Sequence, residues 1–468
     1  MLTALSVPTV WYWSEWAVRV GALAFVPRGR PAAETRAWLL LIFFLPVLGL
    51  LLFAVVGSAR YPRWRRQRFV ATSSFQSAIL SGLAPHSPDL GRGAPVAALA
   101  KTLGDLPAVD GNTARMMQDY DAVIDQLVSD IDEAVHSVHV LVYIFADDAT
   151  GARVATALGR AVERGVDVRV MLDPVGSGRW LRGTVGLMHA NQVQLLLSLP
   201  LRFLSHRTRR DMRNHRKVIV IDDRIGYAGS QNIVDKDFRP GIVNRELVVR
   251  LTGPIVAALA AVVHRDWAIE RGKGYESRMP SIEAGGSAVV QLLPSGPSYR
   301  LPGFETLLIW QLHQATTRVV IATPYFIPSE SLIDAMRIAV ARGVTVELLV
   351  SKAVDQRFVN WAQSSYYETV MDVGVRVNLF QKGLLHAKNV SIDRCFAIVG
   401  SSNVDIRSFR LNEEVSLLFY DTASIDQVIE IQDGYLAESD QIDIREWRRR
   451  SPVRRLVENF AQMTSSLL

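Results

Sequence analysis

One short polar pattern occurs twice in the chain, and this repetition restricts the fold more than any other feature of its 468 residues. In each copy a histidine is followed two positions later by a lysine, then by an aspartate and a Gly-Ser-x-Asn segment, with no insertion. The copies begin at His215 and His386, 171 positions apart (386 − 215), and match at six positions. Such a match does not arise readily by chance. We interpret the chain as an internal duplication of two similar halves, not as a longer repeat array.

The repeated side chains suit phosphoryl chemistry. Alternate residues of a strand point the same way, so each histidine and its lysine are expected to project from one face. A histidine there can attack phosphorus, and the lysine can neutralise phosphate oxygens. Serine and asparagine can donate further hydrogen bonds to those oxygens. The repeated positions are His215, Lys217, Asp222, Gly229, Ser230 and Asn232 in the first half, and His386, Lys388, Asp393, Gly400, Ser401 and Asn403 in the second.

Two histidines suit a double displacement, in which one forms phosphohistidine while the other protonates the leaving alcohol. This chemistry needs no metal and no cofactor, and the sequence has no evident carboxylate cluster for a two-metal site. Cys395 is the only cysteine, which excludes a cysteine-based zinc site. Each histidine needs a partner on its second ring nitrogen to fix its tautomer. The candidates are Glu246 and Glu414, 31 and 28 residues after the two histidines (246 − 215, 414 − 386).

The expected elements follow the same order in both halves. Each half has an apolar strand, a helix that ends at a glycine (Gly165 and Gly343), and an alternating strand after it. The residues after each motif lysine, 218–222 and 389–393, predict one more strand. Helices that alternate with strands predict an α/β fold with two duplicated α/β/α domains, each with a mixed sheet covered by helices.

Residues 37–59 form an apolar stretch of 23 residues without a charge, bounded by Arg36 and Arg60. As one helix it would be about 34 Å long, enough to cross a hydrocarbon core of about 30 Å, with a kink at Pro46. The alternative is a buried core helix, which is rarely apolar all round over this length. We expect this segment to anchor the chain in a membrane as one span or as part of a helical hairpin.

The flanks of this stretch bear on its path. Residues 2–26 are apolar but contain Glu15 and Arg19, four apart on one helical face, and predict either a first span or an interfacial helix. By the positive-inside rule, the arginines after the stretch favour a cytoplasmic location for everything downstream. The arginines before it agree only if the segment re-enters as a hairpin. The two clusters are Arg60, Arg63, Arg65, Arg66 and Arg68 after the stretch, and Arg28, Arg30 and Arg36 before it.

The C-terminus predicts an amphipathic helix. Ser451 and Pro452 suit an N-cap and a first helical position, and the basic run 445–450 precedes them. A basic cluster beside such a helix suits an anionic membrane surface, and the alternative is a helix packed on the protein. Its apolar positions are Val453, Leu456, Val457 and Phe460.

The cationic run Ser205–Lys217 includes His206 and predicts either a rim that docks phosphate or a solvated loop. The histidines without a repeated context are expected to be packing or surface residues. They are His136, His139, His189, His264 and His313.

The paired motifs resemble those of the phospholipase D superfamily, and the chain as a whole is similar to its bacterial cardiolipin synthases. Further matches lie in residues 36–57, 143–148, 323–328, 403–409 and 411–415. The resemblance implies two phospholipase D-like domains that pack face to face around one active site. It also implies a reaction that joins two phosphatidylglycerol molecules into cardiolipin and releases glycerol.

The resemblance also implies residue roles. His215 is the nucleophile and His386 the general acid and base, although the two copies are chemically alike and leave this order open. Asp222 and Asp393 support the site. The first motif reads Gly-Ser-Gln-Asn, which departs from the family pattern. The set of hydrogen-bond donors around the phosphate in this half is therefore left open. The phosphate-binding set is Lys217, Lys388, Ser230, Asn232, Ser401 and Asn403.

We therefore expect a membrane segment at 1–60, a basic juxtamembrane region and linker at 61–110, a first catalytic domain at 111–280, and a second at 281–468. The expected partners are phosphatidylglycerol, cardiolipin and an anionic membrane, without nucleic acid; an oligomer is possible. The formal charge of +6 suits anionic lipid. The expected location is the bacterial cell membrane, with the catalytic domains in the cytoplasm.

Four other functions are compatible with the same motifs. A hydrolase would resolve the phosphohistidine with water and release phosphatidic acid, and a related transferase would take its phosphatidyl group from phosphatidylethanolamine. A nuclease or phosphodiesterase would act on nucleic acid, although the apolar N-terminus gives it no reason to be at a membrane. A scaffold with a vestigial site is opposed by two complete motifs.

Overall fold

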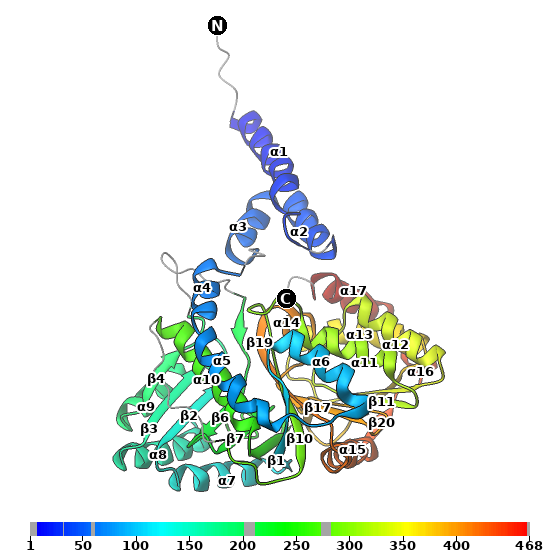
Figure 1. Cartoon of the computed structure of the whole chain (residues 1–468). Coiled ribbons are helices and arrows are strands. Elements are labelled where there is room, and N and C mark those ends of the chain that lie inside the picture. The colour runs from blue at the N-terminus through cyan, green and yellow to red at the C-terminus, as the bar shows by residue number, and fades with distance from the viewer. Residues whose placement is uncertain (1–6, 31, 58–60, 201–210, 273–281, 466–468) are drawn as a thin grey trace.

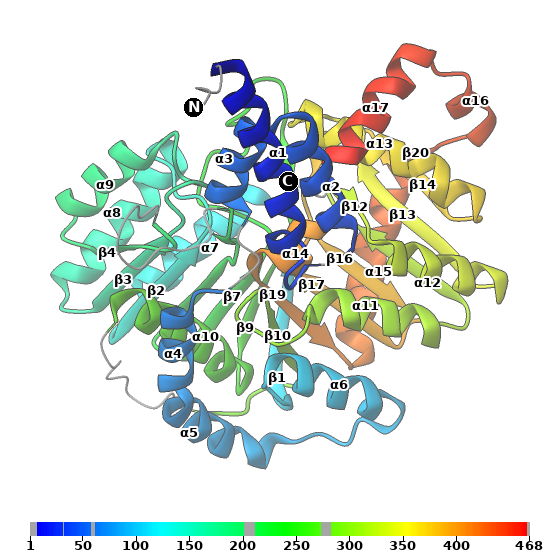
Figure 2. The ribbon, with the colours of Figure 1, turned by 90° about the horizontal axis from the view of Figure 1, so that it is seen from above.

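The computed structural model describes residues 7–30, 32–57, 61–200, 211–272 and 282–465. Two α/β halves lie side by side beneath three N-terminal helices (Figure 1). A view from above shows the first half on one side of the central strands and the second half on the other (Figure 2).

The first half contributes strands to one large sheet in the order β4-β3-β2-β6-β7-β9-β1. Strands β2, β3 and β4 are parallel, whereas the neighbours from β2 through β6, β7 and β9 to β1 are antiparallel, so the sheet is mixed as predicted. The bounds are Ala108–Met117 (β1), Ser137–Val142 (β2), Asp167–Leu172 (β3), Gln194–Leu197 (β4), Val218–Ile221 (β6), Ile225–Gly229 (β7) and Val248–Thr252 (β9).

The second half repeats this order as β14-β13-β11-β16-β17-β19-β10, with β20 added outside β14. The strand after each motif lysine, β6 or β16, occupies the same place in both halves, which confirms the duplication at the level of topology. The bounds are Ala288–Ser295 (β10), Arg318–Ala322 (β11), Thr345–Ser351 (β13), Arg376–Phe380 (β14), Asn389–Ile392 (β16), Phe396–Gly400 (β17), Asn412–Phe419 (β19) and Ser439–Gln441 (β20).

The two halves join through their edge strands. Strand β1 pairs antiparallel with β10, with Val109 opposite Val290, so one sheet runs through the whole catalytic part. The halves therefore share one sheet through these edges, where each edge strand satisfies the backbone donors and acceptors of the other. Strand β7 also contacts β17 and β19 of the second half, and β9 contacts β17, so the contact between the halves is not confined to the edges.

Helices cover both faces of this sheet. Helices α10 and α15 pack on one face, in a core that includes residues of both halves. Helices α7 and α8 cover the other face of the first half, and α11, α12 and α13 that of the second. The bounds are Tyr120–Asp132 (α7), Ala149–Glu163 (α8), Leu181–Ala190 (α9), Ile255–Arg271 (α10), Gly303–Gln314 (α11), Glu330–Ala341 (α12), Arg357–Asp372 (α13), Ile406–Arg410 (α14) and Thr422–Ala437 (α15).

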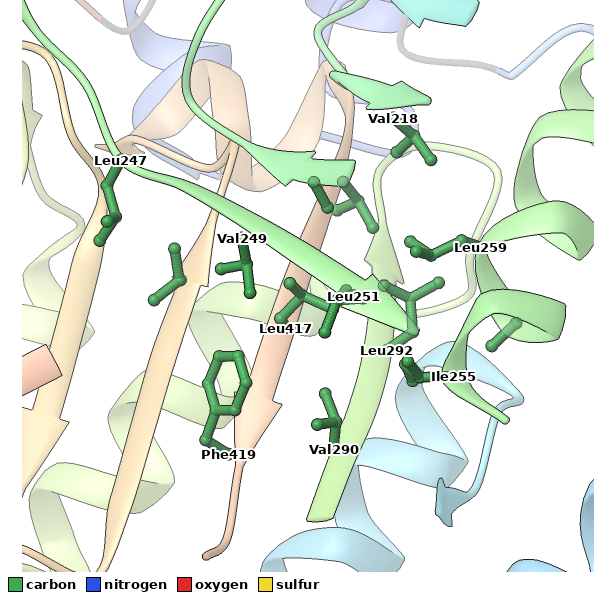
Figure 3. Packing of buried hydrophobic residues seen from close by; sticks show 14 of the residues in the cluster. Val218, Leu247, Val249, Leu251, Ile255, Leu259, Val290, Leu292, Leu417 and Phe419 are labelled. Carbon is green, nitrogen blue, oxygen red and sulfur yellow. The ribbon is translucent and has the colours of Figure 1, made fainter. Parts of the chain in front are cut away.

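The shared core lies where the halves meet. Val249 of β9, Leu292 of β10 and Leu417 of β19 are fully buried and belong to one core with Leu259 of α10 (Figure 3). Fully burying a side chain of this size stabilises the fold by about 1.5–3 kcal/mol. Because both halves supply these side chains, the core fixes the halves relative to each other.

Helix ends follow the sequence signals. Asp148 caps α8 by accepting the amide of Gly151, and Ser329 caps α12 by accepting that of Leu332. Gly165 and Gly343, predicted as C-terminal caps, follow the ends of α8 and α12 with positive φ values of 86° and 88°.

The apolar N-terminal segment forms helices α1 (Val7–Phe25), α2 (Ala32–Phe44) and α3 (Pro46–Val56). Helix α2 ends before Pro46, and α3 folds back on it, because the rings of Trp38 and Phe53 lie 5.3 Å apart. Fifteen residues of a straight helix would separate them by roughly 22 Å. The predicted single 34 Å helix is therefore wrong, and the segment is a hairpin. Within the described residues, no helix is long and apolar enough to cross a membrane.

Helices α1, α2 and α3 together have an unusual surface for a domain that faces water. Their small interior contains Ala22, Val26, Trp38 and Ile42, while most of their large apolar side chains are exposed. The predicted pair of Glu15 and Arg19 forms, at 3.0 Å. The exposed set includes Trp11, Trp13, Leu23, Phe44, Leu48 and Leu51.

Residues 61–110 are largely helical. Helices α4 (Arg63–Ala71), α5 (Ser73–Leu83) and α6 (Ala94–Gly104) run along the catalytic part (Figure 1). Arg65 of α4 is buried and pairs with Glu270 of α10 at 2.7 Å. This ion pair ties the segment after the hairpin to the first half.

Candidate active site

The two histidines are placed by short strands that cross between the halves. Strand β5 (Arg213–Asn214), which precedes His215, pairs with the start of β19 in the second half. Strand β15 (Leu384–Leu385), which precedes His386, pairs with β8 (Asn244–Arg245) in the first half. The amide of His215 donates to the carbonyl of Glu413 at 2.9 Å, and that of His386 to the carbonyl of Arg245 at 2.8 Å.

Because these strands cross, each histidine pairs with the glutamate of the other half. Nδ1 of His215 lies 3.0 Å from both carboxylate oxygens of Glu414. Nδ1 of His386 lies 2.8 and 2.9 Å from those of Glu246. Sequence order associates each glutamate with the histidine of its own half, and the structure pairs it with the other. The two glutamates are the residues expected beside the histidines, with their partners exchanged.

Each carboxylate accepts from Nδ1 of its histidine and leaves the ring neutral, with the lone pair on Nε2. Burial and the nearby lysines lower the pKa of His215 and of His386 to about 4, although the paired glutamates act in the opposite direction. Burial opposes ionisation of Glu246 and Glu414, but the facing histidine and lysine outweigh it and lower the pKa of both carboxyls. With Nδ1–H donated to the carboxylate, Nε2 carries the lone pair.

The two motif lysines lie beside the histidines. Nζ of Lys217 donates to the carbonyl of His215 at 2.7 Å, and Nζ of Lys388 to that of His386 at 2.6 Å. Burial lowers the pKa of Lys217 to about 7 and that of Lys388 to about 8. Lys388 also lies 3.2 Å from Nε2 of His386. Among the described residues, no hydrogen bond reaches Nε2 of His215, so the two halves differ here.

Both histidines face one cavity of about 440 Å³. Asn232 and Asn403 line it as well, and Asn232 is held by accepting the amide of Ile144 at 3.1 Å. His215, His386, Asn232 and Asn403 therefore come together, as the duplication predicts. Cationic and acidic side chains complete the lining, including Arg213, Arg239, Asp355, Asp405 and Arg407.

The motif serines do not face this cavity. Ser401 is fully buried and donates to Glu414 at 2.6 Å, while its oxygen accepts the amide of Val415 at 3.0 Å. Ser230 accepts the amide of Leu247 at 2.9 Å beside Glu246. The expectation that these hydroxyls bind phosphate is corrected, because each lies behind the glutamate and helps to hold it.

The motif aspartates lie far from the histidines. Asp222 and Asp393 follow β6 and β16, at the ends remote from the motif histidines, roughly 20 Å along the chain. Asp222 accepts backbone amides of Val135, His136 and Ser137, and Asp393 accepts those of the equivalent loop before β11. Both hold a turn and neither lines the cavity, so the support expected from Asp222 and Asp393 acts on the fold and at a distance from the histidines.

Arg216 is a buried residue of the site that the motif comparison did not single out. Its Nε donates to the carbonyl of Glu414 at 3.0 Å, and its guanidinium pairs with Asp266 at 2.5 Å and Glu413 at 3.0 Å. The equivalent position in the second half is Ala387. Because this residue differs between the copies, the duplication gave no signal for it.

Two tyrosines of the site were also missed as functional residues. The ring of Tyr143 lies 4.8 Å from that of His215, and the ring of Tyr325 lies 6.5 Å from that of His386. Both follow the first parallel strand of their half and line the cavity. The signal was present in the segments 143–148 and 323–328, which resemble family signatures.

Two further expectations concern residues outside this cluster. His206 lies outside the described residues. In the part of the chain that the structure describes, no group of three or more His, Cys, Asp or Glu side chains is arranged to hold a metal ion.

Comparison with known proteins gives consistent results. The family model described as "Cardiolipin synthase, PLD-like domain" matches residues 127–267 and 308–434, and one described as "Phospholipase D-nuclease N-terminal" matches 17–58. The chain is 30% identical to cardiolipin synthase A of Serratia proteamaculans over 462 residues, covering 95% of each chain. It is 30% identical to that of Salmonella arizonae over 470 residues, covering 97% of each.

Solved structures show a similar fold. Phosphatidylserine synthase of Haemophilus influenzae superimposes with a TM-score of 0.61 at 16% identity, covering 81% of this chain and 99% of that one. Polyphosphate kinase of Porphyromonas gingivalis superimposes with a TM-score of 0.51 at 15% identity, covering 76% of this chain and 53% of that one. At these identities the likeness concerns the fold alone.

Proposed function

Since this chain belongs to the cardiolipin synthase family of the phospholipase D superfamily, and is thus a phosphatidyltransferase, we propose that it joins two phosphatidylglycerol molecules into cardiolipin and releases glycerol. The observation that carries the proposal is the crossed arrangement of two histidine–glutamate pairs around one cavity with two buried lysines. A single phosphorus atom between the two rings can then be attacked from one side and released on the other.

In the first step Nε2 of His215 attacks the phosphorus of one phosphatidylglycerol. The new N–P bond forms as the bond from phosphorus to the glycerol headgroup oxygen breaks, and His386 gives that oxygen its proton. The charge of the bound phosphodiester raises the pKa of His386, which allows it to carry this proton. Glycerol leaves, and a phosphatidyl group remains on His215.

In the second step His386 takes the proton from a glycerol hydroxyl of the second phosphatidylglycerol. That oxygen attacks phosphorus, the N–P bond breaks, and His215 returns to its neutral state. Two observations support His215 as the nucleophile and His386 as the general acid and base. Among the described residues no hydrogen bond reaches Nε2 of His215, whereas Lys388 contacts Nε2 of His386. Lys217, Lys388, Asn232 and Asn403 stabilise the charge on the phosphate oxygens, each by up to about 3–4 kcal/mol.

The membrane supplies both substrates in this proposal. The exposed apolar surface of α1, α2 and α3 holds the enzyme on the bacterial cell membrane, with the catalytic halves on the cytoplasmic side. The hairpin turn at Pro46 supports this orientation, because it brings the arginines before α2 and those after α3 to the same side of the membrane. Phosphatidylglycerol is concentrated there, whereas nucleic acid has no access to an apolar surface.

Product identification tests the proposal. Full-length enzyme reconstituted in vesicles with phosphatidylglycerol labelled in its headgroup is expected to release labelled glycerol and to form cardiolipin, as read by mass spectrometry. Phosphatidic acid without cardiolipin would show a hydrolase. Ethanolamine release from added phosphatidylethanolamine would show a different donor.

Two histidine variants test the mechanism. His215→Ala and His386→Ala are each expected to lower kcat by at least about 10³-fold, because each removes one partner of a double displacement. His189→Ala on the exposed face of α9 is the matched control and is expected to keep full activity. A His215→Ala enzyme with normal turnover would exclude the phosphohistidine.

A further inference from the structure

The C-terminal helix α17 (Pro452–Ser465) uses one face to pack on the protein. Ala461 is fully buried near Ile327 and Ala362 of the second half. Glu458 is buried as well and pairs with Arg450 and Arg454, each at 2.9 Å. The acidic side chain of this helix is therefore turned inward and neutralised.

A second face of α17 is apolar and exposed. Val453, Leu456 and Met463 expose 71%, 70% and 68% of their surface, and Phe460 exposes 62%. These positions are spaced 3, 4 and 3 apart, so they form one stripe along the helix. The alternative of a helix packed on the protein is therefore confirmed for one face of α17, while the opposite face keeps an exposed apolar stripe.

This stripe lies at the end of the molecule that carries the apolar N-terminal helices. Helix α17 and the hairpin α2–α3 are drawn at the same end in Figure 1, and they lie close together in the perpendicular view of Figure 2. Helix α14, whose Ile406 and Arg407 line the active-site cavity, lies toward that end of the catalytic part in Figure 1. Residues of the cavity therefore lie toward the end of the molecule that carries both exposed apolar surfaces.

Arginines are the most numerous charged residues around the stripe. Arginines at 445, 448, 449, 454 and 455 are all exposed and belong to α16 (Ile444–Arg448), to α17 or to the turn between them. Arg448 pairs with Glu368 and Asp372, Arg454 with Glu458, and Arg455 with Glu368. Residues 444–465 hold six arginines and two glutamates, so the outward surface combines apolar side chains with a net positive charge. That combination fits an anionic phospholipid surface, where apolar burial and attraction to headgroups add.

We propose that the Val453–Met463 stripe docks on the anionic lipid surface of the membrane as a second contact, separate from the N-terminal hairpin. The two contacts hold the end of the molecule that carries α14 against the bilayer, so that both lipid headgroups reach the histidines without leaving the membrane. This inference extends the proposed function, and its main test reads contact with lipid independently of turnover.

Fluorescence quenching tests the contact. A Leu456→Cys variant of the full chain, in a Cys395→Ser background, carries one environment-sensitive dye and is reconstituted in vesicles of phosphatidylcholine and phosphatidylglycerol. Its emission is expected to shift to the blue, and lipids brominated on the acyl chain are expected to quench it. The control carries the dye at Thr156→Cys, an exposed position of α8 far from α17 in Figure 1, and is expected to show neither change.

Other outcomes would overturn the proposal. A dye at 456 that behaves like the dye at 156 excludes lipid contact. Quenching by a dye on a second copy of the chain, without quenching by lipid, shows that the stripe is a surface between copies. A blue shift of equal size in vesicles of phosphatidylcholine alone excludes the role of the arginines.

A functional variant separates this proposal from the proposed reaction. Leu456→Gln keeps the packed face of α17 intact and is expected to raise the apparent KM for phosphatidylglycerol in vesicles, with kcat on a soluble short-chain phosphatidylglycerol unchanged. Ile338→Gln on the exposed surface of α12 is the matched control. Quenching at 456 in an enzyme that makes no cardiolipin would remove the proposed reaction and leave the docking surface; cardiolipin synthesis without quenching would do the reverse.

Discussion

The two lysines beside the histidines set the alkaline limit of the proposed reaction. The pKa of Lys217 is lowered by burial to about 7 and that of Lys388 to about 8. Each ammonium is lost as the pH rises through its pKa, and with it the charge that attracts the phosphodiester. Burial also lowers the pKa of His215 to about 4, so its ring nitrogen is available only above that pH. The pKa of His386 in the free enzyme is also about 4, and this ring must carry a proton in the first step, so kcat/KM is expected to fall above that pH. We expect this fall to become steeper between about 7 and 8, where the lysines lose their charge.

The dependence of kcat/KM on pH measures this, because it reflects groups of the free enzyme. Circular dichroism over the same range controls for unfolding. Lys101→Met, at an exposed position of α6, is expected to keep the alkaline fall. A kcat/KM that stays level from neutral to strongly alkaline pH would contradict the assignment of the lysines.

The aspartate that ends each motif gives a second prediction. Asp393 accepts the amides of Thr316, Thr317 and Arg318, and Asp393→Ala leaves them without this partner. The expected cost is about 1–3 kcal/mol of the free energy of unfolding, seen as a lower thermal midpoint, with kcat per folded molecule unchanged. Asp426→Ala, which removes a surface ion pair with Arg394, is the control. A lower kcat of Asp393→Ala with an unchanged thermal midpoint would show that Asp393 takes part in the reaction.

At this scale the sequence predicts which residues meet but not how they are paired. His215, Lys217, His386 and Lys388 were predicted because the duplication marks them. The exchange of Glu414 onto His215 depends on strand pairing between the halves, which no local pattern encodes. Arg216 has no counterpart in the second half, so a comparison of the copies cannot find it.

The strands that lie within one half can be predicted from the sequence, whereas the strands that join the two halves cannot. Strand β6 is continuously apolar, and in β16 polar and apolar residues alternate, so both strands were predicted. Strand β1 contains Gly111 and Asn112, where its register with β10 shifts, and these residues hide it as a loop. Pro294 near the end of β10 weakens that signal as well. Likewise, hydropathy detects residues 37–56 but not the hairpin that Pro46 initiates.

Strand β10 provides a test of the edge-to-edge junction. Leu292 is fully buried, opposite Leu417 of β19, in the core that both halves share. Leu292→Ala is expected to cost about 2–5 kcal/mol and to lower one thermal transition of the catalytic part. Differential scanning calorimetry measures this, and Ile338→Ala on the exposed face of α12 is expected to change it little. Two separated transitions, with only one shifted, would show that the halves unfold independently.

Across the whole molecule, the duplication places the chemistry where the two halves meet. Each half supplies a histidine to the cavity and a glutamate to the histidine of the other half, so the site exists only where the halves meet. The elements outside the duplication, α1–α3 and α17, lie at the same end of the molecule (Figure 1). In the proposals above, these elements give a lipid-facing direction to a site that is otherwise nearly symmetric.

Removal of residues 1–57 tests whether the N-terminal helices serve membrane contact and not the catalytic site. The hairpin has its own small core, and none of the three catalytic cores includes a residue of it, so the shortened chain is expected to keep its thermal midpoint. Its kcat on a soluble short-chain phosphatidylglycerol is expected to remain unchanged, because the cavity is lined by residues from 143 onward. Turnover on vesicles is expected to fall by roughly 10²-fold, since one of two linked membrane contacts is lost. Phe44→Ala in the full chain, which trims one exposed side chain, is the control. Full activity of the shortened chain on vesicles would show that α17 alone suffices to hold the enzyme at the membrane.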